Sequence, residues 1–477
     1  MNRREFLTLS SITAAVTAAT GAADNSSGRT GKGDEDVTAS YVTETEKRVR
    51  LAGDYDVCVL GGSCTGVFAA VRAAQLGAKV ALVEKQNAFG GVATSGLVNV
   101  WHTLQDTEGK QTIIGGLTKE VIDRLRNIDA ASGKSDHILN TEELKIELDK
   151  LVLENRVTPF LHTLYVAACM EGTRITAVFI ENKDGRRAIR AKVFVDATGD
   201  GDLARDAGIP FSIRDGLQPP TTCAKISALP KGFPGLVTKY RNEFGLAEDR
   251  GWGGGIPGSS GGMQMCAYTH VFKTDASDAK QLTAAEIEGR RQIRAMMDIV
   301  RKYGGDNNKP FLGSLASYIG VRETRSFKAN YTLTENDVLY GKRFPDAIAN
   351  GSYRVDVHDP VKGGFTFKNL NGTTLTVGPG GTTNGRWREA TAENPTFYQI
   401  PFSTMVNQKV DNVIMAGRMI STDRGAFGAI RVMVNLNQVG EAAGVAAALS
   451  VSGDKAVSNI DVQNLRGQLS KFGAVII

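Results

Sequence analysis

The sequence predicts an α/β fold, with three layers around a parallel central sheet and an inserted α+β region. Near residue 55 an apolar run, a helical stretch and a second apolar run follow one another with short connections, as in a βαβ unit. After residue 404 the chain again has a buried strand pattern followed by a long Ala-rich helix. The 477 residues exceed what one hydrophobic core usually holds, so we expect the sequence between these regions to pack separately.

The first βαβ unit begins with YDVCVLG, residues 55–61, a compact apolar run typical of a buried parallel strand. We expect a helix at Val67–Leu76 and a second strand at Lys79–Glu84. Helical patterns also occur at Leu117–Ile128 and Thr141–Glu154, the latter with acidic residues in its first turn.

The later elements are predicted in the same way. Two β-rich runs flank Asn182–Gly185, which signals a hairpin. A long amphipathic helix is expected at Thr283–Tyr303, a buried strand at Asn412–Gly417 and a helix at Ala429–Leu449. The glycine-rich segment Gly253–Gly258 has no predicted strand before it and no helix after it, so we expect a loop.

Composition narrows the possible partners. A net charge of +5, without a Lys/Arg run or an interleaved aromatic stripe, argues against nucleic acid. The five cysteines form no CxxC pair, so neither a zinc site nor an iron–sulfur cluster is expected. Their odd number and the buried position expected for Cys58 argue against a disulfide framework, although a single bridge stays open.

The N-terminus is expected to be an export signal. Arg3 and Arg4 precede Phe6 and Leu7, then come a short apolar stretch and small residues near 22–23. The paired arginines resemble a twin-arginine signal, which predicts a periplasmic or cell-envelope location; the alternative is a disordered basic tail. No other segment has the roughly 18 consecutive apolar residues of a membrane span, so we expect no stable span.

The sequence VLGGSCTG, residues 59–66, joins the first strand to the first helix. Against GxGxxG it has Gly61 and Gly66 at the outer positions and Ser63 at the middle one. Gly61 permits the tight turn, Gly66 permits close helix–strand packing, and the helix N–H groups at 64–67 are expected to bind a diphosphate. Glu84 follows Gly61 by 84 − 61 = 23 residues, where a carboxylate accepts from ribose hydroxyls.

With VEK at 83–85 and FGGVATSGL at 89–97, this motif resembles the FAD-dependent oxidoreductase family, related to glutathione-reductase-type flavoproteins. DATGDGD (196–202) and AGRMIS (416–421) are similar to its second and third signatures, and the sequence from Gly428 resembles its closing helix. Other segments resemble a subgroup distantly related to the flavin subunit of heterodisulfide reductase; they are GVRETR (320–325), FPDAIANGSY (344–353) and DVHD (356–359). The departures are Ser63 in place of glycine and the missing iron–sulfur cysteines.

The resemblance implies FAD, bound non-covalently rather than covalently, in a Rossmann-like domain. We expect it to contact Gly61, Gly62, Ser63, Cys64, Thr65, Gly66, Glu84, Lys85, Gly90, Gly91, Val166, Ala197, Thr198, Gly199, Asp200, Gly417, Arg418, Gly428, Ala429 and Ile430. The expected division is an export signal (1–23), a linker (24–50), a FAD-binding domain in three parts (51–100, 136–215 and 405–465), a cap or connecting segment (101–135), a substrate or cap domain (216–404) and a C-terminal tail (466–477).

Five residues are candidates for substrate binding or catalysis. His358, between Asp356 and Asp359, is either a proton-exchanging group or a structural histidine, and His102 is either above the flavin ring or in a loop. Arg322 and Arg325 either hold an anionic group or form internal salt bridges with Glu323 or a nearby Asp. Arg431, expected in the first turn of the closing helix, opposes the helix dipole and therefore implies a specific partner.

The resulting prediction is an oxidoreductase that transfers a hydride between a small organic substrate and flavin N5. A quinone, cytochrome or other envelope partner would accept or supply the electrons. The alternatives are a non-catalytic FAD-bearing electron-transfer or binding protein and an NAD-dependent dehydrogenase. No second nucleotide-binding βαβ unit is visible, so NAD(P)H binding as in disulfide reductases is not expected. Neither the substrate nor the oligomeric state follows from the sequence.

Overall fold

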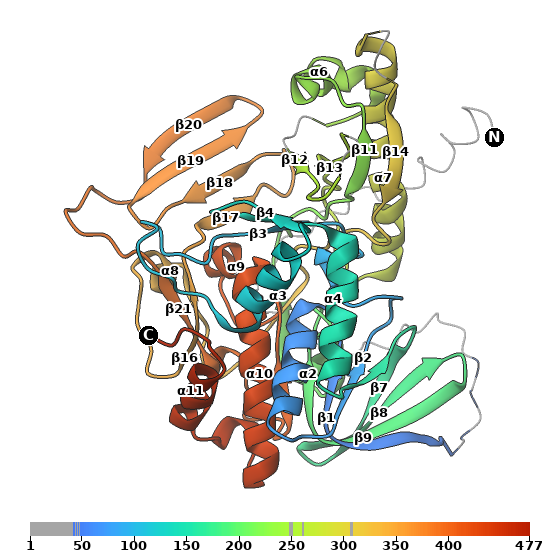
Figure 1. Ribbon diagram of the computed structural model, residues 1–477, viewed down its shortest axis with the longest axis vertical. Helices are drawn as coiled ribbons and strands as arrows, with labels where there is room; N and C mark the ends of the chain where they lie inside the picture. The colour runs from blue at the N-terminus through green and yellow to red at the C-terminus, as the bar shows by residue number, and fades with distance from the viewer. Residues whose placement is uncertain are drawn as a thin grey trace, which may run out of the picture. The chain divides into compact units, whose positions relative to one another are not determined.

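The largest sheet among the described residues of the computed structural model has seven strands and lies at the lower right of Figure 1. The path of the sheet is β6-β2-β1-β9-β8-β7, and β22 also pairs with β9. Its strands are β1 (Leu51–Leu60), β2 (Val80–Val83), β6 (Thr158–Phe160), β7 (Leu164–Glu171), β8 (Arg174–Asn182), β9 (Gly185–Asp196) and β22 (Val413–Met415).

The structure describes residues 42, 44, 46, 48–247, 251–259, 262–305 and 309–477, which fall within one unit of the chain, residues 36–477. The expected export signal at 1–23 and most of the expected linker at 24–50 lie outside the described residues.

The strand β9 divides the sheet into a parallel and an antiparallel part. β1 pairs in parallel with β2 and β9, β2 with β6, and β22 with the C-terminal end of β9. The first half of β9 pairs antiparallel with β8, and the predicted hairpin is confirmed by the pairing of Asn182 with Gly185. The carboxyl ends of the parallel strands therefore meet at one edge, where α/β folds bind ligands.

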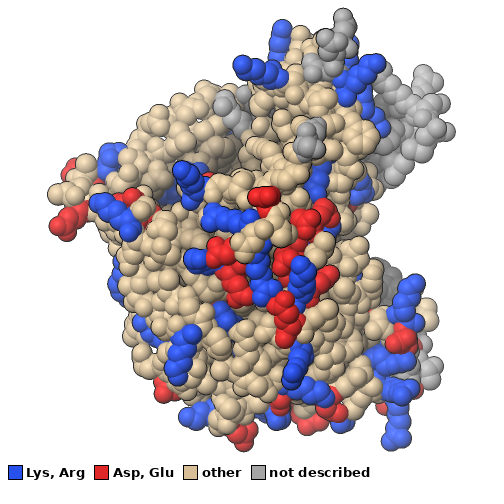
Figure 2. Space-filling model, viewed as in Figure 1, with Lys and Arg blue, Asp and Glu red and all other residues tan. Residues whose placement is uncertain are grey.

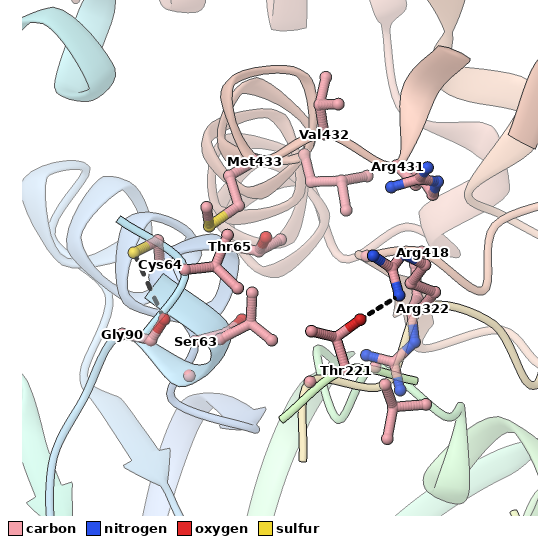
Figure 3. Close-up of a pocket in the computed structure, with 18 of the residues that line it drawn as sticks. Ser63, Cys64, Thr65, Gly90, Thr221, Arg322, Arg418, Arg431, Val432 and Met433 are labelled. Atoms are coloured by element: carbon pink, nitrogen blue, oxygen red, sulfur yellow. Dashed lines mark hydrogen bonds between the residues drawn. The ribbon is translucent and has the colours of Figure 1, made fainter. Parts of the chain in front are cut away.

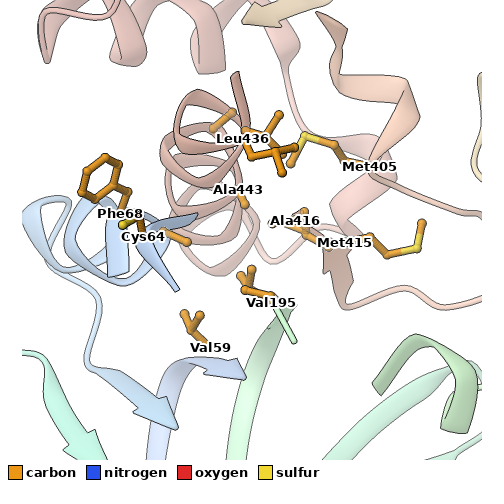
Figure 4. Packing of buried hydrophobic residues seen from close by; sticks show 14 of the residues in the cluster. Val59, Cys64, Phe68, Val195, Met405, Met415, Ala416, Leu436 and Ala443 are labelled. Atoms are coloured by element: carbon orange, nitrogen blue, oxygen red, sulfur yellow. The ribbon is translucent and has the colours of Figure 1, made fainter. Parts of the chain in front are cut away.

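Two helices, α2 (Cys64–Gln75) and α10 (Met433–Gly453), pack against each other and against β1 and β9. Figure 4 shows Leu436 and Ala443 of α10 between α2 on one side and Ala416 on the other. Gly440 and Gly444 of α10 lie on the face of the helix that contacts α2. A Cβ on either glycine would come within 2.2 Å or 2.0 Å of a backbone carbonyl oxygen of α2, so these glycines permit close helix–helix packing.

Further helices pack around this pair, namely α3 (Gly116–Arg126), α4 (Thr141–Glu154) and α11 (Val462–Lys471). The bounds predicted for α4 are confirmed, with Asn140 as the N-cap that accepts from Glu142 N. Figure 2 shows charged side chains of both signs gathered over α3 and α4. They pair with each other, for example Arg124 with Glu120 and Glu154, so this surface carries no excess of one sign.

The inserted region, residues 216–404, is α+β as predicted. A four-stranded sheet has the order β12-β13-β11-β14, and a second has the order β17-β18-β19-β20. Their strands are β11 (Ala224–Ser227), β12 (Trp252–Gly255), β13 (Gln264–Ala267), β14 (Phe311–Leu315), β17 (Val355–His358), β18 (Phe365–Lys368), β19 (Thr373–Gly378) and β20 (Gly381–Arg386). The helices are α6 (Phe233–Tyr240), α7 (Ala279–Tyr303) and α8 (Glu335–Leu339), and α7 extends the predicted helix by one turn.

The prediction of a loop at Gly253–Gly258 is wrong for its first half, because Gly253–Gly255 belong to β12, which pairs with β13. Sequence periodicity cannot detect a strand whose residues have no side chains.

Shorter elements complete the fold: β3 (Val100–Trp101), β4 (Ala131–Ser132), β5 (His137–Leu139), α5 (Asp202–Asp206), β10 (Phe211–Ile213), β15 (Arg325–Phe327), β16 (Ala347–Gly351), β21 (Tyr398–Pro401) and α9 (Arg424–Ile430). Among the described helices, none combines the length and apolar character needed to cross a bilayer.

Candidate functional site

A cavity of about 800 Å³ opens at the carboxyl edge of the parallel strands. The ends of β1, β2 and β9, the N-termini of α2 and α10, and several loops of the inserted region line it. Figure 3 shows residues from both halves of the chain facing the same space, with Ser63 and Thr65 on one side and Arg322 and Arg431 on the other. The cavity therefore joins the first βαβ unit to the inserted region.

The N-terminus of α2 is built to leave backbone donors for a ligand. Ser63 caps the helix, because its Oγ accepts from Gly66 N at 3.4 Å and its carbonyl accepts from Val67 N at 2.8 Å. The expectation that all the N–H groups at 64–67 face a diphosphate is therefore too broad. The N–H groups of Cys64 and Thr65 remain without an intrahelical acceptor, since the first turn of a helix has none to offer.

Gly61 has φ +98°, and a Cβ there would lie 2.3 Å from the carbonyl oxygen of Ala197. A Cβ on Gly66 would lie 1.8 Å from the carbonyl oxygen of Gly61. The turn after β1 is thus in direct backbone contact with the end of β9 and with helix α2, and only glycine fits at these two positions.

The buried carboxylate of Glu84, at the end of β2, closes the other side of the turn. Its Oε2 accepts from Gly62 N at 2.7 Å and its Oε1 accepts from Gln86 N at 2.8 Å. Each carboxylate oxygen has a second lone pair, so Glu84 is positioned to accept from two more donors in the cavity.

Asp196, at the end of β9, stabilises the turn that follows this strand. It is fully buried and accepts hydrogen bonds from Thr198 N, Thr198 Oγ1 and Ala204 N. Burial raises the pKa of Asp196 to about 6. Asp200 pairs with Arg418 and accepts from Thr324 Oγ1 at 2.7 Å, and the positive charge of Arg418 holds its pKa low against the effect of burial. The second and third sequence signatures therefore meet in one ion pair.

The closing helix differs from the prediction. Helix α9 ends at Ile430, Arg431 and Val432 form a break, and α10 begins at Met433. Gly428, Ala429 and Ile430 accordingly do not line the cavity, whereas Arg431, Val432 and Met433 do. A Cβ on Gly428 would lie 2.7 Å from the carbonyl oxygen of Asp356, so this glycine brings α9 close to β17.

His358, Asp356 and Arg431 form a buried group at the far end of the cavity. Arg431 Nη2 donates to Asp356 Oδ2 at 2.9 Å, and Tyr353 Oη donates to the same oxygen at 2.9 Å. His358 Nε2 lies 3.4 Å from Asp356 Oδ1, which is buried and accepts no hydrogen bond from the described residues. The specific partner expected for Arg431 is thus Asp356.

Burial lowers the pKa of His358 well below 6.5, and electrostatic interactions with Arg322, His270 and Arg431 lower it further. The imidazole is therefore neutral near pH 7 and can accept a proton.

The remaining candidates are divided between the cavity and the interior. Arg322 lines the cavity and donates from Nη1 to Pro219 O and Thr221 Oγ1, both at 2.5 Å. His102 also lines it, with Nδ1 3.2 Å from Asp136 Oδ1. Arg325 does not: its Nη1 donates to Asp200 O and pairs with Asp202 at 3.0 Å, which is the internal salt bridge given above as its alternative.

Most of the residues expected at FAD line the cavity, namely Gly61, Ser63, Cys64, Thr65, Glu84, Lys85, Gly90, Gly91, Ala197, Thr198, Gly199, Asp200, Gly417 and Arg418. Gly62 and Gly66 lie behind its surface. Val166 is not part of it either, because residues 163–165 before it form that wall.

Sequence reasoning missed several cavity residues, among them Tyr318, His270, Trp252, Phe365, Phe367 and Asn437. Asn437 is the most informative, because it is fully buried and neither its Nδ2 nor its Oδ1 has a hydrogen-bond partner among the described residues. An amide in a helix that is mostly Ala, Val and Leu was a detectable signal, since buried polar groups normally have partners.

The five cysteines are free thiols, and burial raises the pKa of Cys64 to about 12. Within the described ranges, no group of three or more His, Cys, Asp or Glu side chains is arranged to hold a metal ion.

Residues 56–469 match the protein family described as FAD dependent oxidoreductase. Mitochondrial dihydrolipoyl dehydrogenase of Schizosaccharomyces pombe is 28% identical over 160 residues, which are 31% of this chain and 28% of that protein. Dihydrolipoyl dehydrogenase of Bacillus subtilis is 42% identical over 62 residues, 13% of each protein. The chain therefore matches less than a third of these relatives.

Among solved structures, the chain is similar to a geranylgeranyl bacteriochlorophyll reductase-like protein of Thermoplasma acidophilum, with 10% sequence identity and a TM-score of 0.41. The match covers 88% of this chain and 84% of that protein. It is also similar to a flavin-dependent brominase, with 12% sequence identity and a TM-score of 0.43. That match covers 88% of this chain and 82% of the brominase.

Proposed function

Because this chain belongs to the FAD-dependent oxidoreductase family, we propose that it is an enzyme that oxidises or reduces a small organic substrate with bound FAD. The observation that carries the proposal is the continuity of the cavity, which runs from the glycine turn after β1 to the His358–Asp356–Arg431 group. A dinucleotide and a proton-exchanging group would thus share one enclosed space.

The cavity residues fit FAD. The N–H groups of Cys64 and Thr65 suit the diphosphate, and the two open lone pairs of Glu84 suit the adenosine ribose. Val432 and Met433 place the positive end of the α10 dipole at the cavity, where it suits the electron-rich edge of the flavin ring. The unsatisfied amide of Asn437 is the strongest sign that the chain alone does not complete this site. When bound, FAD supplies a hydride acceptor or donor at N5.

The chain's own contribution would be to orient the substrate and to move a proton. Neutral His358 accepts a proton, and the carboxylate of Asp356, whose Oδ1 lies 3.4 Å from His358 Nε2, stabilises the positive charge that results. Arg431 and Tyr353 hold Asp356 in place from the other side. This division favours an enzyme over a bare electron carrier, which needs no buried proton acceptor.

Two further parts of the proposal concern the cellular context. The Arg3–Arg4 pair and the apolar stretch after it support export to the periplasm or cell envelope. An envelope quinone or cytochrome would then exchange electrons with the enzyme. Replacing both arginines with lysine tests the export step, and retention of the protein in the cytoplasm is the expected result.

The central experiment is to purify the protein, record its visible spectrum and identify any flavin released by heat. We expect bound FAD in the natural sequence and its loss in Gly61→Ala, where the new Cβ meets Ala197. Gly208→Ala is the matched control, since Gly208 also has a positive φ, +76°, but has no atom within 4 Å of the added Cβ. A colourless protein that takes up no added FAD would overturn the proposal.

A further inference from the structure

One wall of the cavity is a continuous row of rings and a guanidinium group, which we call the aromatic wall. It consists of His102, Tyr353, Arg354, Phe367, Phe365, His358 and His270, all of which line the cavity. It contains none of the residues that fit FAD, so it is available to the substrate.

Each member of the aromatic wall contacts the next. The successive separations are 4.3 Å for His102–Tyr353, 5.6 Å for Tyr353–Arg354, 3.8 Å for Arg354–Phe367, 4.4 Å for Phe367–Phe365, 5.7 Å for Phe365–His358 and 5.2 Å for His358–His270. The ring of Phe367 thus packs against both Arg354 and Phe365, and such contacts stabilise the wall.

The register of β17 and β18 turns these rings towards the cavity. Asp356 pairs with Phe367 and His358 pairs with Phe365, so all four side chains share one face of the sheet. The other face of β18 carries Thr366 and Lys368, and Lys368 pairs with Glu335 outside the cavity. Alternation along a strand therefore separates an aromatic face from a polar one.

The same end of the cavity offers donors that have no acceptor among the described residues. Arg431 Nε is buried and has no hydrogen-bond partner among the described residues, although Nη2 is used by Asp356. The exposed guanidinium of Arg354 contacts Phe367 and Tyr353 and makes no ion pair with any described residue. Arginine donors of this kind bind carboxylates in preference to neutral oxygens.

Building on the proposed function, we propose that the substrate carries a flat apolar ring together with an acidic group. The ring lies against the edges of Phe365 and Phe367, and the acidic group binds at Arg431, with Arg354 attracting it at the cavity mouth. This chemistry places the acid within reach of His358, the proposed proton acceptor.

The test compares the binding of three probes that separate the apolar ring from the acidic group. Benzoate has ring and acid, benzyl alcohol has the ring alone, and acetate has the acid alone. Binding is measured by calorimetry and by tryptophan fluorescence, to which Trp252 in the cavity lining contributes, on protein whose FAD content has been determined. We expect benzoate to bind roughly tenfold or more tightly than either partial probe.

Two variants test whether benzoate binds at Phe365 of the aromatic wall and at the neighbouring Arg431. Phe365→Leu keeps apolar volume but removes the ring, and Arg431→Lys keeps the charge at Asp356 but removes Nε. Each should weaken benzoate roughly fivefold or more, and Phe365→Leu should leave acetate unchanged. The controls are Phe311→Leu and Arg294→Gln, whose side chains are exposed and lie outside the cavity.

Benzoate that binds no better than acetate or benzyl alcohol overturns the inference, as does benzoate binding that both wall variants leave unchanged. Protein that holds FAD but fails this test keeps the proposed function. Protein that takes up no FAD but still binds benzoate through Phe365 and Arg431 keeps the substrate site and loses the proposed function.

Discussion

Gly440 of α10 lies so close to Thr65 of α2 that a Cβ on the glycine would come within 2.2 Å of the Thr65 carbonyl oxygen. The N–H group of Thr65 is one of the two that suit the diphosphate. The helix that begins beside the proposed flavin ring therefore rests on the residue proposed to bind the diphosphate.

The first prediction is that Gly440→Ala weakens both the fold and FAD binding, because the methyl group must push the two helices apart. Overpacking of this kind costs about 1–3 kcal/mol. Thermal unfolding and FAD titration measure the two effects. Gly467→Ala in α11 is the control, because its added Cβ meets no atom within 4 Å and alanine favours helix. Equal behaviour of the two variants would contradict the packing argument.

The second prediction concerns Glu84→Gln, which removes the charge that accepts from Gly62 and Gln86 and that suits the ribose. A hydrogen bond to a charged group contributes about 1.5–3 kcal/mol, so FAD should bind roughly 10–100 times more weakly. FMN, which lacks the adenosine ribose, should bind the variant and the natural protein alike. Calorimetry with both flavins decides, with exposed Glu108→Gln as the control. Equal losses of affinity for FAD and FMN would show that Glu84 does not bind the adenosine ribose.

Local patterns predicted the parts of the site that depend on local backbone geometry. The glycine turn, Glu84 and the bounds of α4 follow from strand, turn and capping rules that act over a few residues. The break between α9 and α10 was not predicted, because no Pro marks it. The break depends instead on contacts with residues distant in the sequence. Arg431 donates a hydrogen bond to Asp356, and Tyr398 Oη donates to Ala429 O at 3.0 Å.

The substrate end of the cavity was predicted only in part for the same reason. His358 stood out because of its neighbouring carboxylates, but the hydrogen bond that joins one of them, Asp356, to Arg431 spans 75 residues. Arg322 and Arg325 are three positions apart and look equivalent in sequence. The structure separates them, because β15 begins at Arg325 and turns that side chain towards Asp202.

The third prediction is that Arg322→Gln raises the pKa of His358, because it removes one of the positive charges that lower it. NMR of protein with labelled histidines can follow this, since the chain has only five. The acidic limb of flavin reduction by a substrate should move to higher pH in the same variant. Arg294→Gln, on the exposed side of α7, should change neither quantity. An unchanged His358 titration would show that Arg322 does not act on it.

The fourth prediction is a pH dependence of stability that comes from Asp196. Burial raises its pKa from 3.8 to about 6, so its contribution to stability is complete below pH 3.8 and is lost as the pH rises to 6. At 1.36 kcal/mol for each pKa unit, the loss is about 3 kcal/mol. Asp196→Asn removes the titrating group, so between pH 4 and pH 7 the natural protein should lose stability relative to this variant. Urea unfolding at several pH values measures the difference, with exposed Asp54→Asn as the control. A difference that stays constant with pH would mean that Asp196 is ionised throughout and is stabilised by its three donors, Thr198 N, Thr198 Oγ1 and Ala204 N.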